Sequence, residues 1–398
     1  MSILFTDKLS SNPFTAATEL RADGRLLRRK IPIIGKVWLT TDQEIATLIL
    51  KDSENFGVRK PNGKAVGLQW WMPKTIQLLA SNMLTMDGAE HKRLRQIVDR
   101  AFRREAIMAL EPEIENMANE MASQLFNEGN EVDLVSTFAR RFPLAVICEL
   151  LGLPKQDREQ FARWAEGFTR INGALDFLKL IPRLKAMTKY IQQRVEEARV
   201  SGGKGLIAEL VVAKDQKDNM SDDELIAMVF LLLIAGHETT THLISGGVLA
   251  LLQNEDQKQW LYEDWDRANV AVEELLRFVT PVQLTKPRYA FSDKNLGGVQ
   301  VRKGDLIMAL LTAANYDEKL IEDPQLLKLD RKPNRHIGFG SGIHFCLGHQ
   351  LARLEGKHAI KALLSHYPDL ALVTDKIKFR KRVGINALAE LKIKPQYL

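Results

Sequence analysis

The most constraining feature of this sequence is a long apolar segment with a polar interruption at its middle. Ser221-x-x-Glu224 has the spacing of a capping box, in which two side chains satisfy free amide groups at a helix start. The twelve residues that follow, 225–236, carry no polar side chain. Such a run is buried on every face, because a surface helix shows polar residues at every turn. The segment therefore predicts a long helix through the core of a large folded protein.

The polar interruption invites a functional interpretation. Residues 236–242 read Gly-His-Glu-Thr-Thr-Thr-His, and apolar residues resume at Leu243. A membrane span needs about 18 or more continuous apolar residues, which this order does not supply. Burying Glu238 and several hydroxyl groups costs free energy unless these groups are paired or used. A helix that merely reaches the surface for two turns would show the same pattern, so both interpretations stay open here.

A second informative segment surrounds a cysteine. Residues 339–348 contain three glycines in ten residues around Cys346, which indicates tight turns and a close approach of the backbone to another group. A helix N-terminus beside Cys346 would stabilise a thiolate through its dipole and free amide groups. Cys148 lies in an apolar run, and we interpret it as a buried hydrophobic residue. The residues after Cys346 with the spacing of one apolar helix face are Leu347, Leu351, Leu354, Ala359, Ala362 and Leu363.

Composition and charge exclude several classes of protein. The chain is 45% hydrophobic and 27% charged, as in ordinary globular proteins. Lys and Arg exceed Asp and Glu by 56 − 50 = 6, an excess too small and dispersed to indicate nucleic-acid binding. Two cysteines can form neither a disulfide framework nor a four-cysteine metal site. The first residues contain no stretch long enough for a signal peptide or membrane anchor, so we expect a cytoplasmic protein.

We expect one domain over residues 1–398, mainly α with minor β, because no Pro-, Ser- or Gly-rich linker divides the chain. Apolar spacing predicts helices across residues 93–213. Strands are predicted at residues 299–301 and 305–310, between glycine turns. Thr41-x-x-Glu44 predicts a capped helix. A strand is predicted before that helix, from Ile33, Ile34, Val37 and Leu39. Among the helical stretches, one apolar stripe is formed by Ile114, Met117, Met121 and Leu125.

The cysteine segment resembles the haem-binding signature of the cytochrome P450 family, Phe-x-x-Gly-x-x-x-Cys-x-Gly. The matching residues are Phe339, Gly342, Cys346 and Gly348. Ala235-Gly236-x-Glu238-Thr239-Thr240 is similar to the family's oxygen-activating helix, and Glu274-x-x-Arg277 to its structural ion-pair helix. The likeness extends to Asp87-x-x-Glu90-His91-x-x-x-Arg95 and to Pro333-Asn334-Arg335-His336, and it is closest to soluble bacterial members. It implies a large helical domain, a small β-rich region, and haem between the long central helix and the helix after Cys346.

The resemblance also implies roles for individual residues. Cys346 would be the thiolate ligand of haem b (iron protoporphyrin IX), and a thiolate ligand favours cleavage of the oxygen–oxygen bond. Glu238 and Thr239 are an acid and an alcohol that can relay protons in a pocket that excludes water. Gly236, one turn before Thr239, would leave the oxygen site open. The residues implied to hold the haem propionates are His91, Arg95, Arg288 and His344, and those of the structural network are Glu274, Arg277 and Arg331.

The implied activity is that of a haem-thiolate monooxygenase, which inserts one oxygen atom from O2 into a medium-sized hydrophobic substrate by hydroxylation or epoxidation. Electrons would come from a separate ferredoxin and ferredoxin reductase, because the chain ends about fifty residues after Cys346. We expect a monomer. The basic residues that suit an acidic ferredoxin are Arg103, Arg104, Arg353 and Lys357. The segments expected to contact substrate are residues 70–79, 168–180, 230–233, 282–284 and 385–388.

Three rival interpretations differ in how well they fit. His237 and His242 lie about 140° apart around a helix, so they cannot share a zinc ion as in zinc proteases. A haem sensor or carrier would not need Glu238 and Thr239 near the iron. A peroxide-dependent haem-thiolate peroxygenase is the closest alternative, and dependence on an electron donor separates it from a monooxygenase. One departure from the family is Asn315-Tyr316-Asp317, where an arginine often stands between the asparagine and the aspartate.

Overall fold

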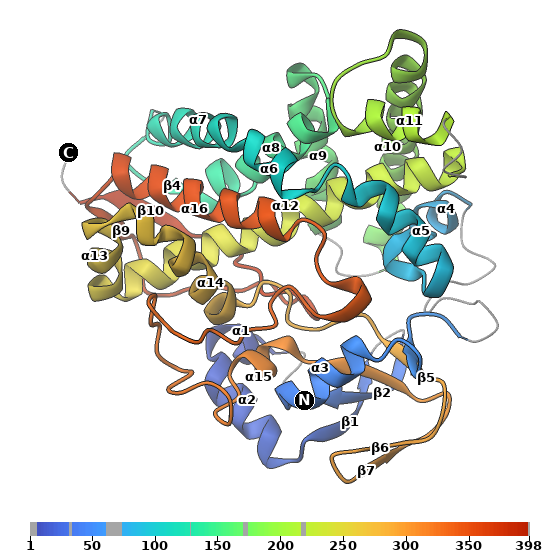
Figure 1. Cartoon of the computed structure of the whole chain (residues 1–398). Coiled ribbons are helices and arrows are strands. Elements are labelled where there is room, and N and C mark those ends of the chain that lie inside the picture. Colours follow the sequence, from blue (N-terminus) through green and yellow to red (C-terminus); the bar gives the residue numbers. More distant parts are fainter. Residues whose placement is uncertain are drawn as a thin grey trace. The chain divides into compact units, whose positions relative to one another are not determined.

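A computed structural model describes residues 6–31, 34–60, 74–127, 129–169, 174–215 and 220–396, with residues 74, 80, 165–169, 174–180 and 214–215 described by their backbone alone. The chain is mostly helical, with short strands grouped in three small sheets (Figure 1). This arrangement confirms the predicted fold class, mainly α with minor β.

The chain forms two compact units. The first contains Met1–Val66, Leu110–Arg140 and Thr239–Leu398, and the second contains Gly67–Ala109 and Arg141–Glu238. The long helix α12 contributes its first half to the second unit and its second half to the first. Neither unit is one continuous segment. The expectation of a single domain over residues 1–398 stays a prediction.

The first unit contains the sheets. The largest has the strand order β1-β2-β8-β5-β3, in which β2 and β8 run parallel and the other neighbours antiparallel. A second sheet has the order β4-β10-β9, and β6 pairs with β7. The strands are β1 (Leu26–Ile31), β2 (Gly35–Thr40), β3 (Phe56–Gly57), β4 (Val132–Asp133), β5 (Arg288–Ala290), β6 (Lys294–Leu296), β7 (Val299–Val301), β8 (Leu306–Ala309), β9 (Leu370–Leu372) and β10 (Lys392–Pro395).

The strand predictions are confirmed in part. Strands β7 and β8 coincide with the predicted positions, and β2 contains Val37 and Leu39. Ile34 precedes β2 in a turn, and Ile33 lies outside the described residues. Strand β1 was not predicted, because Arg28, Arg29 and Lys30 interrupt its apolar pattern. These basic side chains occupy its more exposed positions, while the strand buries both of its ends against the core.

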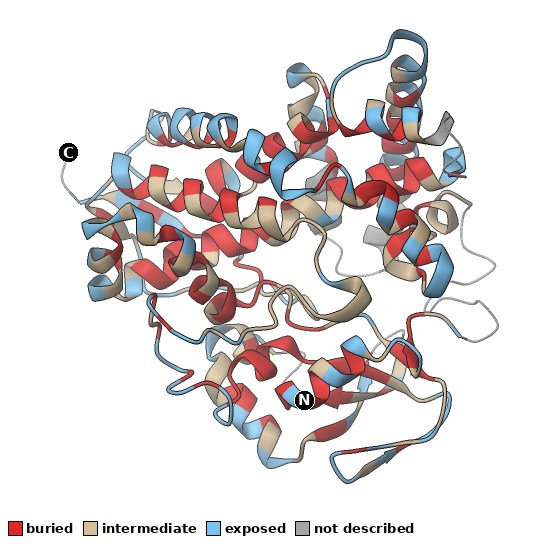
Figure 2. Ribbon diagram, in the orientation of Figure 1, coloured by how far each residue is buried: buried red, intermediate tan, exposed pale blue. Residues whose placement is uncertain are grey.

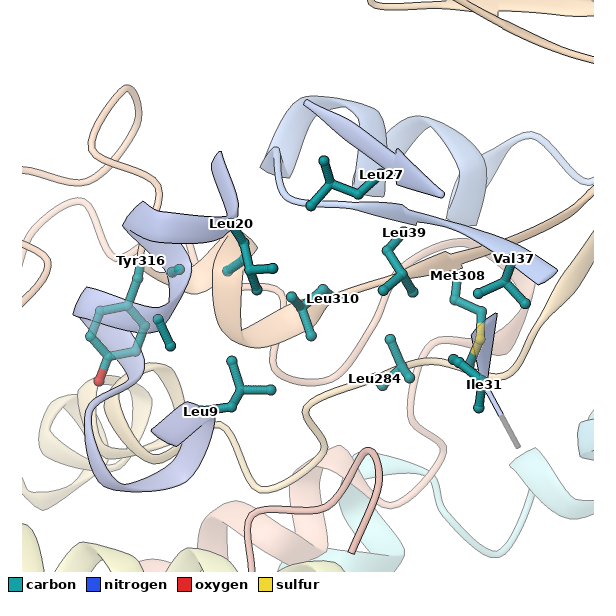
Figure 3. Close-up of a cluster of buried hydrophobic side chains, with 13 residues drawn as sticks. Leu9, Leu20, Leu27, Ile31, Val37, Leu39, Leu284, Met308, Leu310 and Tyr316 are labelled. Atoms are coloured by element: carbon teal, nitrogen blue, oxygen red, sulfur yellow. The ribbon is translucent and has the colours of Figure 1, made fainter. Parts of the chain in front are cut away.

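One core cluster joins the N-terminal part of the chain to residues 284–316 beside the large sheet. It combines residues of the N-terminal helices and strands with residues that lie near position 310 (Figure 3). Burial of apolar side chains from such distant segments is the main force that closes this part of the first unit. The labelled members are Leu9, Leu20, Leu27, Ile31, Val37, Leu39, Leu284, Met308, Leu310 and Tyr316.

In the first unit α3 packs on the large sheet and α15 packs on α2 and α3, whereas α7 packs on α16 (Figure 1). The buried stripe of α7 is formed by Ile114, Ala118 and Ala122, whereas Met117 and Met121 are half-buried. The predicted stripe is therefore confirmed at Ile114 and at Leu125, which follows the helix, and is shifted by one position between them, where the small alanines are the buried residues. The helices are α1 (Lys8–Ser11), α2 (Pro13–Ala22), α3 (Gln43–Lys51), α7 (Glu111–Ser123), α13 (Glu255–Glu263), α14 (Ala268–Val279), α15 (Leu311–Asn315) and α16 (His349–His366).

Helix α3 begins differently from the prediction. Its N-cap is Asp42, whose Oδ1 accepts a hydrogen bond from the backbone N–H of Ile45 at 3.0 Å. Thr41 instead donates its hydroxyl to the carbonyl of Gly24 at 2.8 Å. The prediction that Thr41 caps this helix was wrong, since a carboxylate one residue later is the stronger acceptor at a helix start.

The second unit is helical. Its helices are α4 (Lys74–Ala80), α5 (Gly88–Asp99), α6 (Arg104–Ala109), α8 (Arg141–Leu151), α9 (Arg158–Thr169), α10 (Ala174–Ser201), α11 (Leu206–Asp215) and the start of α12 (Asp222–Gln253). The capping box before α12 is confirmed, since Ser221 N–H donates to Glu224 Oε2 at 2.8 Å and Glu224 N–H to Ser221 Oγ at 3.1 Å. Cys148 is fully buried in α8, and burial raises the pKa of its thiol to about 12.

Helix α12 has the length and hydropathy of a membrane span. However, 67% of its most apolar window is buried inside the protein, as in the core helix of a globular protein. The predicted helix through the core is therefore observed. No other helix of the described chain meets this test of length and hydropathy.

Gly342 brings the segment before Cys346 directly onto α3. Its φ is +73°, and a Cβ placed on it would lie 2.0 Å from the carbonyl oxygen of Leu50. Gly340 has nearly the same φ, +72°, but a Cβ there would have no atom within 4 Å. Substitutions at the two glycines therefore distinguish the strain of the backbone conformation, which both share, from steric overlap, which occurs only at Gly342.

We expect Gly342→Ala to destabilise the protein by about 3 kcal/mol or more, because left-handed strain and overlap with Leu50 add. Gly340→Ala carries the strain alone and should cost about 1–2 kcal/mol. Urea denaturation of the two variants measures the difference. Equal losses would show that the contact with Leu50 is unimportant.

Candidate active site

Cys346 lies on a short connection between a single helical turn, η6 (Gly342–His344), and α16. Its backbone N–H donates to the carbonyl of Phe339 at 3.0 Å, which closes the loop on itself. The thiol is half-buried and three residues ahead of the first residue of α16. The N-terminus of a helix stabilises negative charge through its dipole. The position therefore suits an ionised sulfur that serves as a metal ligand.

The loop around the cysteine presents a partly accessible apolar surface. Every residue from 332 to 350 is half-buried or exposed, and Figure 2 shows the loop before α16 largely in tan. Ile337, Ile343 and Leu347 are half-buried beside the thiol in sequence. Haem is a flat, largely apolar group whose iron can accept one thiolate ligand. It therefore matches the apolar side chains of this loop and the sulfur of Cys346. The residues present therefore fit a haem group.

The accessible face of α12 carries the two residues proposed for proton transfer. Residues 231–233 and 240–245 are buried, whereas Ala235 is exposed and Glu238 and Thr239 are half-buried. Residues three and four positions apart share one helix face. A polar, accessible face thus interrupts an otherwise buried helix at its middle.

Gly236 lies against α8. A Cβ on it would lie 3.3 Å from the side chain of Ile147 in that helix. The glycine therefore allows close packing of α12 on α8 within the second unit. The expectation that Gly236 leaves an oxygen site open stays a prediction.

The two histidines of α12 face the core. His237 and His242 are 3% and 6% exposed, and His237 Nδ1 lies 2.6 Å from the carbonyl oxygen of Leu233. Among the described residues no group of three His, Cys, Asp or Glu side chains could hold a metal ion.

A buried acid that the sequence did not reveal contacts the same helix. Glu355 of α16 is 2% exposed, and burial raises the pKa of its carboxyl well above the usual range, although a hydrogen bond from Thr240 opposes the shift. Burial therefore favours the neutral form of this carboxyl over the charged one. Glu355 follows Leu354 on the apolar face of α16. A charged residue at such a position is the feature of the sequence that could have revealed this buried acid.

The predicted propionate residues are divided between the two units. In the second unit, His91 is buried in α5, and Arg95 Nε lies 2.8 Å from Asp99 Oδ1. In the first unit, Arg288 is 3% exposed on β5, and His344 is half-buried in η6. All four are described, and Arg288 and His344 belong to the unit that contains Cys346.

The structure brings Glu274, Arg277 and Arg331 together. Arg277 and Glu274 are fully buried and form two hydrogen bonds of 2.8 Å, and Arg331 Nε lies 3.0 Å from both carboxylate oxygens. Asn334 Nδ2 also donates to Glu274, at 3.1 Å. Arg277 donates further to the carbonyls of Asn315 and Pro324. The buried carboxylate thus has several donors, as an interior charge requires.

The neighbouring Glu273 connects both sides of the cysteine loop, and it was missed in the sequence. Its carboxylate lies 3.0 Å from His336 Nε2, before the loop, and 2.5 Å from Arg353 Nε, in α16 after the loop. Burial would raise the pKa of Glu273, but hydrogen bonds from His336 and Arg353 outweigh it and lower the pKa to about 2. Arg353 also lies over the ring of Phe339, 4.6 Å from its centroid.

The basic residues expected to meet a ferredoxin differ in their availability. Arg353 is engaged by Glu273, and Lys357 Nζ lies 2.8 Å from Glu111 Oε1. Arg103 and Arg104 are exposed in the second unit. Two of the four charges are thus partly neutralised within the protein.

Comparison with known proteins identifies the family. A family model described as Cytochrome P450 matches residues 176–381, slightly more than half of the chain. The chain belongs to the cytochrome P450 family. A polyketide biosynthesis cytochrome P450, PksS, from Bacillus subtilis is 35% identical over 96% of this chain and 95% of its own length. Its solved structure has a TM-score of 0.90, with 99% of this chain and 100% of that chain covered.

Two further P450 relatives show the range of the family. A vitamin D(3) 25-hydroxylase from Pseudonocardia autotrophica is 36% identical and covers 98% of this chain and 95% of that protein. A myxobacterial P450, CYP267B1, solved in complex with myristic acid, has a TM-score of 0.89 and 32% identity, with 99% of each chain covered. The protein is thus a P450 monooxygenase, an oxidoreductase of a family that binds haem through a cysteine thiolate.

The segments expected to contact substrate are described only in part. Residues 70–73 and 170–173 lie outside the described residues, and the side chains of 168–180 are not described. Residues 282 and 385 face each other in an antiparallel bridge. Two of the five segments therefore meet within the first unit.

Replacing Glu273 with Gln should destabilise the protein by about 2–3 kcal/mol at pH 7, because the charge paired with Arg353 is lost. A carboxyl with a lowered pKa stabilises the fold above its unfolded pKa, about 4.3, and loses this effect as the pH falls toward 2. Thermal unfolding between pH 7 and pH 3 should therefore show a shrinking difference from wild type. Glu113→Gln, an exposed site on α7, is the matched control, and an equal effect there would contradict the prediction.

Proposed function

We propose that Cys346 is the axial thiolate ligand of haem b and that this P450 inserts one oxygen atom from O2 into an apolar small molecule. The observation that carries this proposal is the position of Cys346. The thiol lies in a loop that bears the complete signature, at the N-terminus of α16, with its backbone fixed to Phe339. When bound, haem supplies an iron centre at which a thiolate favours cleavage of the oxygen–oxygen bond.

Other residues of the chain are proposed to bind the haem propionates or to have a structural role. Arg288 and His344 in the first unit, and His91 and Arg95 in the second, are proposed to bind the haem propionates by charge-assisted hydrogen bonds. The network of Glu274, Arg277 and Arg331 is proposed to have a structural role. None of these three residues is needed as an acid or base.

Glu238 and Thr239 are proposed to deliver protons to the reaction. They lie on the accessible face of α12, where an acid can pass a proton to the hydroxyl beside it. Glu355, whose neutral form is favoured by burial, is proposed as a second acid next to Thr240. An acid and an alcohol placed in this way favour use of O2 over peroxide, which brings its own protons.

The substrate is proposed to be a medium-sized apolar molecule that is hydroxylated or epoxidised. Two of its relatives, a vitamin D(3) 25-hydroxylase and a P450 of polyketide biosynthesis, support an apolar substrate. Electrons are proposed to come from a ferredoxin and its reductase, with the exposed Arg103 and Arg104 as part of the contact. We expect a monomer in the cytoplasm.

The first test is the absorption spectrum of the reduced, carbon monoxide-bound protein. Wild type should show a strongly red-shifted Soret band, because the iron carries a thiolate. Cys346→Ser should lose the band, and Cys148→Ser, a buried cysteine in the second unit, should keep it. A wild-type protein supplied with haem that shows no such band would refute the proposal.

Thr239→Ala should retain haem and substrate binding but divert reducing equivalents to peroxide and water, because the hydroxyl group proposed to relay protons is missing. The ratio of product to donor consumed measures this coupling. Thr241→Ala changes a buried threonine on the opposite side of α12 and should couple as wild type. Equal coupling in Thr239→Ala and wild type would remove Thr239 from the relay, and full activity with peroxide alone would favour the peroxygenase alternative.

A further inference from the structure

The backbone of Cys346 is fixed by Phe339, which lies in a turn of the same loop. The carbonyl of Phe339 accepts the N–H of Cys346 at 3.0 Å. Any movement of this carbonyl moves the residue that carries the sulfur, because the two groups share one hydrogen bond. The groups that hold Phe339 in place therefore also determine the position of the candidate haem ligand.

His336 holds the backbone just before Phe339. Its Nδ1 accepts the backbone N–H of Gly338 at 3.1 Å, and its Nε2 lies 3.0 Å from Glu273 Oε2. A backbone N–H can only donate and an ionised carboxylate can only accept, so the ring is neutral with its proton on Nε2. In any other protonation state the ring would lose one or both of these bonds. Glu273 therefore selects the form of His336 that holds Gly338.

Arg353, in the helix after the loop, holds the side chain of Phe339. Its guanidinium binds Glu273 at two points, from Nε to Oε1 at 2.5 Å and from Nη2 to Oε2 at 3.0 Å. The same guanidinium lies over the ring of Phe339, 4.6 Å from its centroid. Pairing at two points fixes the orientation of the planar group, which a single ion pair at a surface does not. Glu273 therefore keeps Arg353 stacked on Phe339.

The two contacts of Glu273 converge on Phe339, one through its backbone neighbour and one through its ring. We propose that Glu273 is a positioning residue for Cys346, and that its carboxylate keeps the sulfur in the place that ligation of the iron requires. This inference rests on the proposed function, in which Cys346 binds haem. It assigns a role in that site to a residue outside the cysteine signature.

Two replacements of His336 test its two bonds separately. The amide oxygen of Asn can take the place of Nδ1, so His336→Asn keeps an acceptor for Gly338 and loses the contact with Glu273. The amide nitrogen of Gln can take the place of Nε2, so His336→Gln keeps a donor for Glu273 and loses the acceptor for Gly338. The pairing of Glu273 with Arg353 is unaltered by either change.

Glu111→Gln is the matched control for Glu273→Gln. Glu111 also binds one histidine and one other cation, His358 at 2.9 Å and Lys357 at 2.8 Å. The side chains of Glu111 and Glu273 are 20% and 27% exposed, so solvent screens the two carboxylates to a similar extent. Within the described part of the chain, Glu111 has no hydrogen bond or ion pair with the cysteine loop.

The experiment follows the release of Cys346 from the iron in the haem-loaded protein. Every variant is made in a Cys148→Ser background, which leaves Cys346 as the only cysteine. The decay of the red-shifted Soret band of the reduced, carbon monoxide-bound protein is recorded without denaturant. Iodoacetamide labels the released thiol, which is quantified by mass spectrometry, and far-ultraviolet circular dichroism follows global unfolding over the same time.

In Glu273→Gln the band should decay about tenfold or more faster than in the Cys148→Ser parent, because a charge-assisted hydrogen bond is lost. Labelling of Cys346 should follow the decay of the band while the circular dichroism signal persists. The decay should be accelerated less in His336→Gln and least in His336→Asn, since the latter keeps the bond nearest to the loop. Glu111→Gln should behave as the parent.

The inference is overturned if the band decays no faster in Glu273→Gln than in Glu111→Gln. It is also overturned if the band is lost only together with the circular dichroism signal, which would indicate a purely structural role, or if His336→Asn decays as fast as His336→Gln or faster. A parent protein without a red-shifted band would overturn the proposed function as well, whereas a normal band that decays equally in all variants overturns this inference alone.

Discussion

The position of the cysteine depends on two adjacent carboxylates of α14. Glu274 is fully buried and accepts hydrogen bonds from Arg277, Arg331, Asn334 and the backbone N–H of Lys328, the donors that an interior carboxylate needs. Removing one partner of such a buried set costs about 3–5 kcal/mol. Glu273 holds His336 and Arg353, on the two sides of the cysteine loop. One turn of helix thus fixes both the approach to the loop and its exit.

Helix α12 combines a structural and a chemical role. Most of the helix is buried, and the free energy gained by this burial stabilises the helix although a polar face is accessible at its middle. Glu238 and Thr239 lie on that face, and Thr240 contacts the buried acid Glu355 from α16. The helix therefore connects an accessible acid and a buried acid through consecutive residues.

Charges in this protein act more within the fold than the sequence composition suggests. Arg353 and Lys357 form internal ion pairs with Glu273 and Glu111. Arg288 is buried on β5. The net positive charge is therefore a poor guide to partners. The location of each cation decides whether it pairs within the fold or stays accessible at the surface.

Features that depend on residues close in sequence could be predicted from the sequence. The capping box of Ser221 and Glu224, the spacing of Glu274 and Arg277, and the loop of Cys346 each require only a few consecutive residues, because helix periodicity and turn geometry are local. The tertiary structure decided the rest. The contacts of Glu355 with Thr240 and of Glu273 with His336 and Arg353 join distant segments. Such pairings and burial arise only when the whole chain folds, since no local pattern specifies which distant groups exclude water from one another.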